Sequence, residues 1–246
     1  MENRTIIFRA DGNSDIGLGH LVRSSALAAM LREQYACVLA TRCRMIDQLP
    51  DVRDSFTRII ELPEKSYEAE AAEFHNITGP ADLVVLDGYA FDGAYQHQLT
   101  RNGFDLFSID DIHSFKFHSK VIINHAGGIT PLDYAAWPFT QYFLGPHYSL
   151  LRGAFLRAAK DRRNAISDNN CIVCFGGADP VNRTMQVVQD LCKRSDQVDH
   201  IHVVVGSAYR FHAELNDFIG GRENISVHHA VSTGEMVRIM QQCSFA

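Results

Sequence analysis

The sequence predicts an α/β fold in which parallel strands form sheets with helices on both faces. Short β-branched and apolar runs alternate with segments whose apolar residues recur at helical spacing along the 246-residue chain. This alternation is typical of parallel sheets, because each parallel connection needs a crossover that is usually a helix. A polar stretch at 160–170 separates two alternating segments, so we expect two lobes, at 1–155 and 156–246.

The first lobe begins with a buried strand. Residues 5–8 (TIIF) read as this strand and 9–15 as a polar loop. A helix follows, because apolar residues recur at helical spacing at Leu21, Leu27, Ala28 and Leu31. The alternation continues with strands at 37–40, 58–62, 83–86, 106–109 and 121–123, and with helices near Met45 and at 67–74.

The second lobe repeats the pattern over a shorter length. The segment 145–152 (GPHYSLLR) reads as the crossing between the lobes. Strands are expected at 172–175, 201–205 and 225–227, and helices at 181–194, 211–218 and 233–242. The apolar run at 243–246 looks like the opening of one more strand.

Composition and charge exclude several classes of function. The chain is 46% hydrophobic and 21% charged, as ordinary globular proteins are. Its formal charge of −6 and its lack of a Lys/Arg run argue against nucleic-acid binding. No stretch approaches the roughly 18 consecutive apolar residues of a membrane helix, and a secretory apolar region is missing. We therefore expect no membrane association, a cytoplasmic location, and reduced, mostly buried cysteines.

The most informative motif is Gly17-Leu18-Gly19-His20, between the first strand and the first helix. Its glycines let backbone amides approach an anion or a sugar, with a helix N-terminus behind them. His20 falls in the first helical turn, where unpaired N–H groups and the positive dipole end disfavour a protonated imidazole. A neutral imidazole beside an anion site is a candidate general base. The alternative is a tight strand–helix turn in which His20 is only a cap.

A second glycine turn ends the first strand of the second lobe, in the run CFGGADP at 174–180. Backbone amides at Gly176 and Gly177 are placed to cradle a phosphate, with Asn182 as a further polar contact. The alternative is a capped helix with Asp179 as N-cap and Pro180 at the first helical position. The two interpretations are compatible. The turn is not a P-loop or a full dinucleotide fingerprint, since it lacks the Lys-Ser/Thr ending and the third glycine.

Carboxylates close two of the predicted strands. Asp87 follows the strand at 83–86, and Asp110 and Asp111 follow the strand at 106–109. Ligands of open α/β sheets bind beyond the carboxyl ends of the strands. Carboxylates there bind sugar hydroxyls, orient a histidine or hold a cation. A loop or helix capping role would account for any one of these carboxylates alone. They indicate a site only as a set, because they are expected at the same edge of the sheet as His20.

Neither the cysteines nor the histidines predict a metal or redox centre. The run CIVC at 171–174 has redox spacing, but it lies in a buried strand without a helix start between the thiols. The twelve histidines show no ligand-like clustering, and His228 and His229 point to opposite faces of a strand. We expect no metal and no other cofactor.

Several runs then occur in a fixed order along nearly the whole chain: FRAD at 8–11, IGLGH at 16–20 with Arg23, Asp87-Gly88-Tyr89, SIDD at 108–111, Asn124, GPHYSLLR at 145–152 and GGAD at 176–179. In this order they resemble the UDP-2,4-diacetamido-2,4,6-trideoxy-β-L-altropyranose hydrolase family of pseudaminic acid biosynthesis. Relatives of that family include the spore-coat polysaccharide proteins.

The resemblance implies a GT-B architecture, in which two Rossmann-like lobes bind a UDP-sugar. It implies hydrolysis without a metal: water attacks the anomeric carbon and releases UDP and the free sugar. His20 would deprotonate the water, and Tyr89 would take the place of the family's active-site tyrosine. The substrate-binding positions implied are Asp11, Gly17, Gly19, Asp87, Asn124, Tyr148, Arg152, Gly176, Gly177, Asp179 and Asn182.

The second lobe is expected to be truncated, because a complete lobe of this type needs several more strand–helix units. An unfinished parallel sheet exposes an open edge and apolar helix faces, so we expect self-association through this lobe. Two other functions stay open. One is a GT-B glycosyltransferase in which an acceptor replaces water, and the other is a non-catalytic nucleotide-sugar binding domain.

Overall fold

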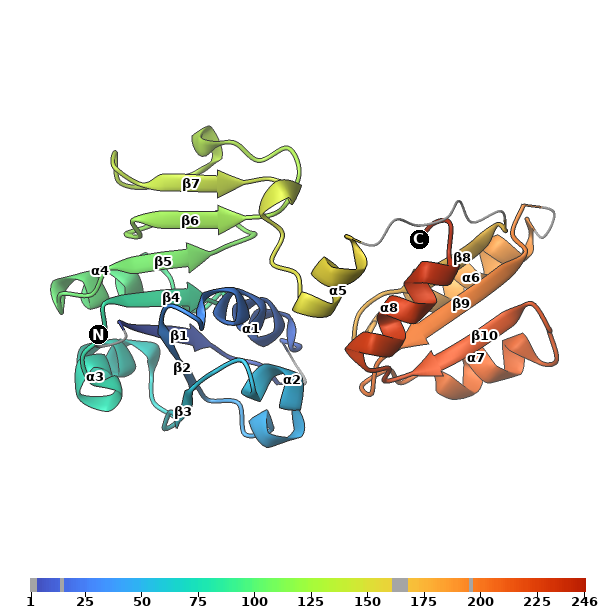
Figure 1. Ribbon diagram of the computed structural model, residues 1–246, viewed down its shortest axis with the longest axis horizontal. Coiled ribbons are helices and arrows are strands. Elements are labelled where there is room, and N and C mark those ends of the chain that lie inside the picture. Colours follow the sequence, from blue (N-terminus) through green and yellow to red (C-terminus); the bar gives the residue numbers. More distant parts are fainter. Residues whose placement is uncertain (1–3, 14–15, 161–167, 195–196) are drawn as a thin grey trace. The chain divides into compact units, whose positions relative to one another are not determined.

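The computed structural model describes residues 4–13, 16–160, 168–194 and 197–246 (Figure 1). The chain divides into two compact units, Met1–Arg152 and Gly153–Ala246. Asp15 and positions 161–167, which the sequence places in polar segments, lie outside the described residues. A seven-stranded sheet forms the first unit and a three-stranded sheet the second, and every strand pair in both is parallel.

The strands of the first unit follow the order β3-β2-β1-β4-β5-β6-β7 (Figure 1). Because β1 has β2 on one side and β4 on the other, the strand order reverses between β1 and β4. Ligands of open α/β sheets bind at such a switch point, beyond the carboxyl ends of the strands. The strands are β1 (Thr5–Ala10), β2 (Ala36–Thr41), β3 (Arg58–Glu61), β4 (Leu83–Asp87), β5 (Leu106–Ile109), β6 (Val121–Asn124) and β7 (Gln141–Leu144).

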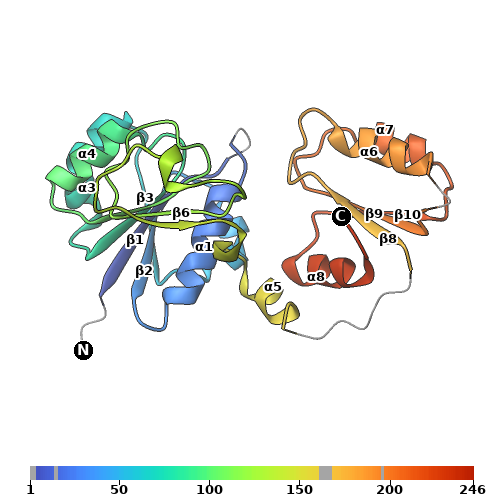
Figure 2. The same ribbon diagram turned by 90° about the horizontal axis from the view of Figure 1, so that it is seen from above.

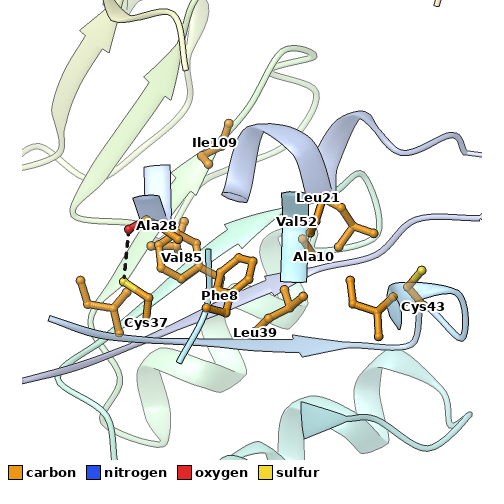
Figure 3. Close-up of a cluster of buried hydrophobic side chains, with 13 residues drawn as sticks. Phe8, Ala10, Leu21, Ala28, Cys37, Leu39, Cys43, Val52, Val85 and Ile109 are labelled. Atoms are coloured by element: carbon orange, nitrogen blue, oxygen red, sulfur yellow. Dashed lines mark hydrogen bonds between the residues drawn. The ribbon is translucent and has the colours of Figure 1, made fainter. Parts of the chain in front are cut away.

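One face of this sheet packs against α1 (Gly19–Leu31), the short helix η1 (Ile46–Gln48) and α2 (Pro50–Arg53). Phe8 of β1, Leu39 of β2 and Leu21 of α1 meet in a dry core (Figure 3). The Cys37 thiol donates to the Ala28 carbonyl at 3.7 Å and so ties β2 to α1. The helix expected near Met45 is present as two short helices, η1 and α2.

The opposite face packs against α3 (Tyr67–Thr78) and α4 (Gly93–Arg101) (Figure 2). Alternate strand residues such as Ile7, Val38 and Val84 point to this side, as the twofold strand periodicity requires. The sequence did not predict α4, whose buried apolar residues are only Tyr95 and Leu99 among polar neighbours. It also did not predict β7, which extends the sheet beyond β6.

Arg9 corrects the expected start of the polar loop, because it lies inside β1 and is completely buried. Its guanidinium is paired: Nε donates to Glu70 at 2.7 Å and Nη1 to Asp11 at 2.6 Å. Glu70 also accepts from Tyr95 Oη at 2.7 Å and from Arg42 Nε at 2.9 Å. Burial alone would raise the pKa of Glu70, but Arg9, Tyr95 and Arg42 hold it below its ordinary value. This buried network joins β1, β2, α3 and α4.

The second unit has the sheet order β10-β9-β8, made of β8 (Asn170–Cys174), β9 (His200–Val205) and β10 (Ile225–His229). The helices α6 (Arg183–Cys192) and α7 (His212–Ile219) cover one face, and α8 (Thr233–Gln242) covers the other (Figure 2). A short helix, α5 (Gly153–Ala158), packs against α8. Phe245 forms a parallel bridge with Cys171, which agrees with the strand opening expected at 243–246.

Three histidines of this unit lie close together, although the described residues contain no group of three His, Cys, Asp or Glu that could hold a metal ion. His200, His202 and His228 lie on one face of β9 and β10, with the His202 Nδ1 and His228 Nε2 atoms 3.1 Å apart. Burial and the neighbouring imidazoles lower the pKa of both His202 and His228 below the ordinary value of 6.5. The pattern was missed because the three residues meet only through cross-strand register.

Across the part of the chain that the structure describes, no helix has both the length and the apolar character needed to cross a bilayer.

Replacing Glu70 by Gln should lower the free energy of unfolding by about 3–5 kcal/mol, because the buried Arg9 loses one of its two charged partners and Arg42 loses its own. The matched control is Glu73→Gln on the same helix. Glu73 is 49% exposed and pairs with the exposed Lys65, so about 1 kcal/mol or less is expected. Urea denaturation followed by fluorescence of Trp137, the single tryptophan, measures both variants. Equal small losses would contradict a structural role for the network.

The second unit should lose stability as pH falls below about 6.5. The unfolded imidazoles bind protons there before the folded His202 and His228 do, so the free energy of unfolding decreases until the folded imidazoles also protonate. His200 and His229 add to the repulsion around His228, and Glu235 opposes it. Urea denaturation at about pH 7.5 and 5.5, followed by circular dichroism, should show the loss. Trp137 reports the first unit separately.

In the variant His228→Gln this pH dependence should shrink, whereas His75→Gln, at an exposed histidine of α3, should leave it unchanged. A wild-type second unit equally stable at both pH values would refute the assignment.

Candidate functional site

The turn before α1 lies at the switch point of the first sheet. Gly17 has a φ of 75°, a left-handed conformation that favours glycine, and its N–H donates to the Asn13 carbonyl at 2.9 Å. Gly19 is the first residue of α1, and a Cβ there would meet no atom within 4 Å. The prediction that His20 lies in the first helical turn is confirmed. No described side chain caps this helix, in contrast to α6 below.

His20 is held by the last residue of β4. Asp87 is completely buried, and its Oδ1 lies 2.8 Å from Nδ1 of His20. The Ser24 hydroxyl donates to Oδ2 of the same carboxylate at 3.2 Å. Because a carboxylate only accepts hydrogen bonds, the shorter contact, from Asp87, favours a proton on Nδ1, whereas Arg23 Nη2, which can only donate, lies 3.1 Å from the same atom. In that tautomer Nε2 is the nitrogen with a free lone pair, and the described hydrogen-bond contacts of the imidazole both reach Nδ1.

Arg23, one turn along α1, braces this pair. Its Nε donates to both oxygens of Asp87, at 2.8 and 2.9 Å, and its Nη1 donates to Asp111 at 2.7 Å. Burial alone would lower the pKa of Arg23, but hydrogen bonds and charge from Asp87 and Asp111 raise it. In the sequence, Arg23 was noted only beside the run at 16–20 and was not predicted as a site residue. Its i+3 spacing from His20, which places both on one helix face, is the signal that identifies it.

Tyr89 and Asp111 complete the cluster. The Tyr89 ring stands edge-on to His20, with the ring centres 4.7 Å apart, and its hydroxyl lies 3.5 Å from Oδ2 of Asp111. Burial and the charge of Asp111 raise the pKa of Tyr89. Tyr89 is 53% exposed, so it forms the outer side of the group. We call His20, Arg23, Asp87, Tyr89 and Asp111 the His20 cluster.

The His20 cluster surrounds the imidazole with charges of both signs. Two carboxylates face one guanidinium, so the group carries a net negative charge when His20 is neutral. A proton arriving on Nε2 is balanced by Asp87 behind the ring. This is the arrangement of a general base oriented by a carboxylate.

Asp11 and Asn124 make internal contacts. Asp11 accepts from Arg9 and from the Arg42 backbone N–H at 2.7 Å, and so ties the ends of β1 and β2 together. Asn124 is completely buried, where it donates to Tyr134 Oη at 2.8 Å and accepts from the Ala126 N–H. Both side chains shape the carboxyl edge of the sheet, and their contact with substrate stays a prediction.

Tyr148 and Arg152 lie on the segment after β7, at η3 (Pro146–Tyr148) and beyond it. The Tyr148 ring packs against Phe143 and His147, and Arg152 lies 3.8 Å from Asp51. These neighbours lie outside the His20 cluster. Their role in binding stays a prediction.

The glycine turn of the second unit packs closely against a neighbouring loop. Gly176 has a φ of 75°. A Cβ on Gly206, at the end of β9, would lie 2.4 Å from the Gly177 carbonyl oxygen, so this approach requires glycine. Gly206 was not predicted from the sequence. It directly follows a predicted strand, as the glycine turn at 176–177 follows the strand before it. This shared position was the signal that could have identified it.

Helix α6 begins later than the capping alternative expects. Asn182, not Asp179, is the N-cap, and Pro180 precedes the helix. Asp179 still accepts from the Arg183 and Thr184 N–H groups, at 2.9 and 2.8 Å, and these bonds hold its pKa low against the effect of burial. The Asn182 amide oxygen accepts from Tyr209 Oη at 2.6 Å and from the Met185 N–H. The first amides of α6 are therefore occupied by side-chain oxygens, and phosphate binding by the glycine turn stays a prediction.

No group of three His, Cys, Asp or Glu residues suited to a metal ion occurs among the described residues.

Comparison with known proteins supplies relatives over most of the chain, although no protein-family model matches it. It is 24% identical over 218 residues to the uncharacterized protein MJ1062 of Methanocaldococcus jannaschii, covering 85% of this chain and 44% of that protein. It is 24% identical over 196 residues to the UDP-2,4-diacetamido-2,4,6-trideoxy-beta-L-altropyranose hydrolase of Campylobacter jejuni, covering 76% of this chain and 66% of that protein. It is 26% identical over 215 residues to the spore coat polysaccharide biosynthesis protein SpsG of Bacillus subtilis, covering 81% and 58%. The chain thus spans about half to two thirds of the length of these relatives.

Solved structures share the fold. A glycosyltransferase from Rickettsia africae superposes with a TM-score of 0.62 at 11% identity, covering 99% of this chain and 72% of that one. A UDP-N-acetylglucosamine 2-epimerase homologue from Listeria monocytogenes gives 0.56 at 11% identity, covering 99% and 73%. The predicted α/β fold of GT-B type is therefore confirmed. The chain resembles the altropyranose hydrolase and the spore coat polysaccharide protein over most of its length, as its motifs predict.

Proposed function

We propose that the chain carries the general base of a nucleotide-sugar hydrolase acting on a UDP-linked diacetamido-trideoxy sugar. In this reaction a water oxygen bonds to the anomeric carbon while the bond from that carbon to the diphosphate oxygen breaks. The bonding electron pair leaves with UDP, and a water proton passes to Nε2 of His20. The products are UDP and the free sugar, and His20 returns its proton to solvent.

One observation carries the proposal: the 2.8 Å contact between His20 Nδ1 and the fully buried Asp87 carboxylate. It directs the lone pair of Nε2 outward and provides a negative charge to stabilise the imidazolium that proton transfer creates. Arg23 keeps the carboxylate in place through two hydrogen bonds. Hydrolysis needs no other group to take the proton from water.

The relatives support the class of substrate. The Campylobacter protein is named for hydrolysis of a UDP-linked diacetamido sugar, and the Bacillus protein for polysaccharide biosynthesis. We therefore place the reaction in the biosynthesis of such sugars, including pseudaminic acid.

The remaining positions take supporting roles in this proposal. Tyr89 packs edge-on to the imidazole of His20. Gly17 and Gly19 let the chain approach the sugar, and Gly176 and Gly177 donate amides to the diphosphate. Tyr148 and Arg152 stay as predicted contacts of the substrate.

A glycosyltransferase is the second candidate, because the solved structures that share this fold include a glycosyltransferase. The same His20–Asp87 pair would then deprotonate a hydroxyl of an acceptor instead of water. Measuring UDP release with and without sugar acceptors separates the two functions, since a hydrolase needs no acceptor.

The variant His20→Asn should lower the rate of UDP release by about 10²–10⁴-fold, because water loses its base. Binding of the UDP-sugar should stay nearly intact. The control is His75→Asn, an exposed histidine of α3, which should keep the wild-type rate. A His20→Asn variant that hydrolyses at the wild-type rate would refute the base assignment.

The variant Asp87→Asn should also lose about 10²-fold or more in rate, because a carboxamide no longer fixes the tautomer or balances the imidazolium. Asp105→Asn, at a 48% exposed carboxylate paired with Lys120, is the control and should be neutral. Circular dichroism verifies that both variants fold. Full activity in a folded Asp87→Asn protein would mean that the pair is only structural.

A further inference from the structure

Asp111 has one carboxylate oxygen with a clear partner and one without. Oδ2 accepts from Arg23 Nη1 at 2.7 Å and faces the Tyr89 hydroxyl. Oδ1 is buried and has no hydrogen-bond partner among the described residues. Buried polar atoms are nearly always hydrogen-bonded, and a charged acceptor has the strongest need of a donor. The Asp111 side chain as a whole is 30% exposed, so a small rotation of the carboxylate would present this atom to an O–H or N–H group from outside the protein.

The adjacent Asp110 provides the contrast. Its Oδ2 accepts from Tyr134 Oη at 2.9 Å and from the His113 N–H at 2.8 Å. Asp110 is therefore committed to internal hydrogen bonds, whereas Asp111 turns toward Arg23 and Tyr89. The two consecutive carboxylates after β5 therefore differ: Asp110 makes internal hydrogen bonds, whereas Asp111 keeps one oxygen without a partner among the described residues.

Charge decides which part of a nucleotide sugar fits beside Asp111. The His20 cluster holds two carboxylates, and its one guanidinium already donates to both of them. A diphosphate brought there would meet net negative charge without a free cation from the cluster. A neutral sugar carries hydroxyl and amide donors and no charge, so it satisfies Oδ1 without repulsion.

We propose that Asp111 binds the sugar ring of the nucleotide sugar, with Oδ1 accepting a hydrogen bond from a ring hydroxyl or from an acetamido N–H. This rests on the proposed function, because it places the sugar next to His20. It also makes Asp111 a specificity residue: a sugar without a donor at that position leaves a buried charged oxygen unpaired and is bound more weakly.

The experiment compares the affinity of the full chain for two probes, UDP-2,4-diacetamido-2,4,6-trideoxy-β-L-altropyranose and UDP alone. Calorimetric titration is carried out in the His20→Asn background to prevent turnover, with Asp111→Ala and Asp111→Asn added, and Asp105→Ala as control. Asp111→Ala should weaken UDP-sugar binding about 10- to 100-fold and leave UDP binding within about twofold. Asp111→Asn should fall between, because its single carbonyl oxygen serves either Arg23 or the sugar. Asp105→Ala should change neither affinity.

Equal weakening of both probes by Asp111→Ala would overturn the proposal, since it would indicate general damage to the site. Unchanged affinity for both probes would overturn it as well, as would a chain that binds no UDP-sugar. The proposed hydrolysis is tested separately, by measuring UDP release in the protein with His20 intact. If that protein binds the UDP-sugar without releasing UDP, hydrolysis is refuted while the Asp111 result stands.

Discussion

The buried carboxylate of Asp87 organises the first unit and its candidate site together. Three residues of α1 reach it: His20 contacts Oδ1, Ser24 contacts Oδ2 and Arg23 contacts both oxygens. An unpaired carboxylate at that depth would be strongly destabilising, so these contacts fix how α1 sits over the end of β4. The same contacts set the orientation of the imidazole. The position of α1 and the orientation of the His20 imidazole therefore both depend on the Asp87 carboxylate. Disrupting the site would also destabilise the first unit.

The neighbouring buried charges are also stabilised by pairing, but they pair with one another inside the protein. Arg9, Glu70, Arg42 and Asp11 pair with one another beside the switch point, and the hydrogen bonds of Glu70 are all internal. In the His20 cluster the pairing is incomplete, with Nε2 of His20 and Oδ1 of Asp111 left for a ligand. The first network stabilises the edge of the sheet, and the second is available for chemistry. In the second unit, Asp179 and Asn182 occupy the first amides of α6, which leaves the glycine turn as the proposed phosphate contact.

Much of this arrangement could be predicted from local sequence signals. The strand cores, the first-turn position of His20 and the strand-end placement of Asp87 and Asp111 depend on hydrophobic period and on residues close in sequence. The errors concern contacts between distant segments. Arg9 was placed in a loop because its partner Glu70 lies 61 residues away. The meeting of His202 with His228 depends on strand register, and the need for Gly206 depends on a loop that folds against it. Such pairings exist only once the chain has folded.

The tautomer of His20 tests the central claim most directly. In ¹⁵N-labelled protein, long-range proton–nitrogen correlations distinguish the protonated nitrogen of a neutral imidazole from the unprotonated one. Because Asp87 can only accept at Nδ1, the account predicts a proton on Nδ1 and a bare Nε2, and a change of this pattern in Asp87→Asn. A neutral His20 that carries its proton on Nε2 would contradict the account, since the outward nitrogen would then have no lone pair to accept a proton.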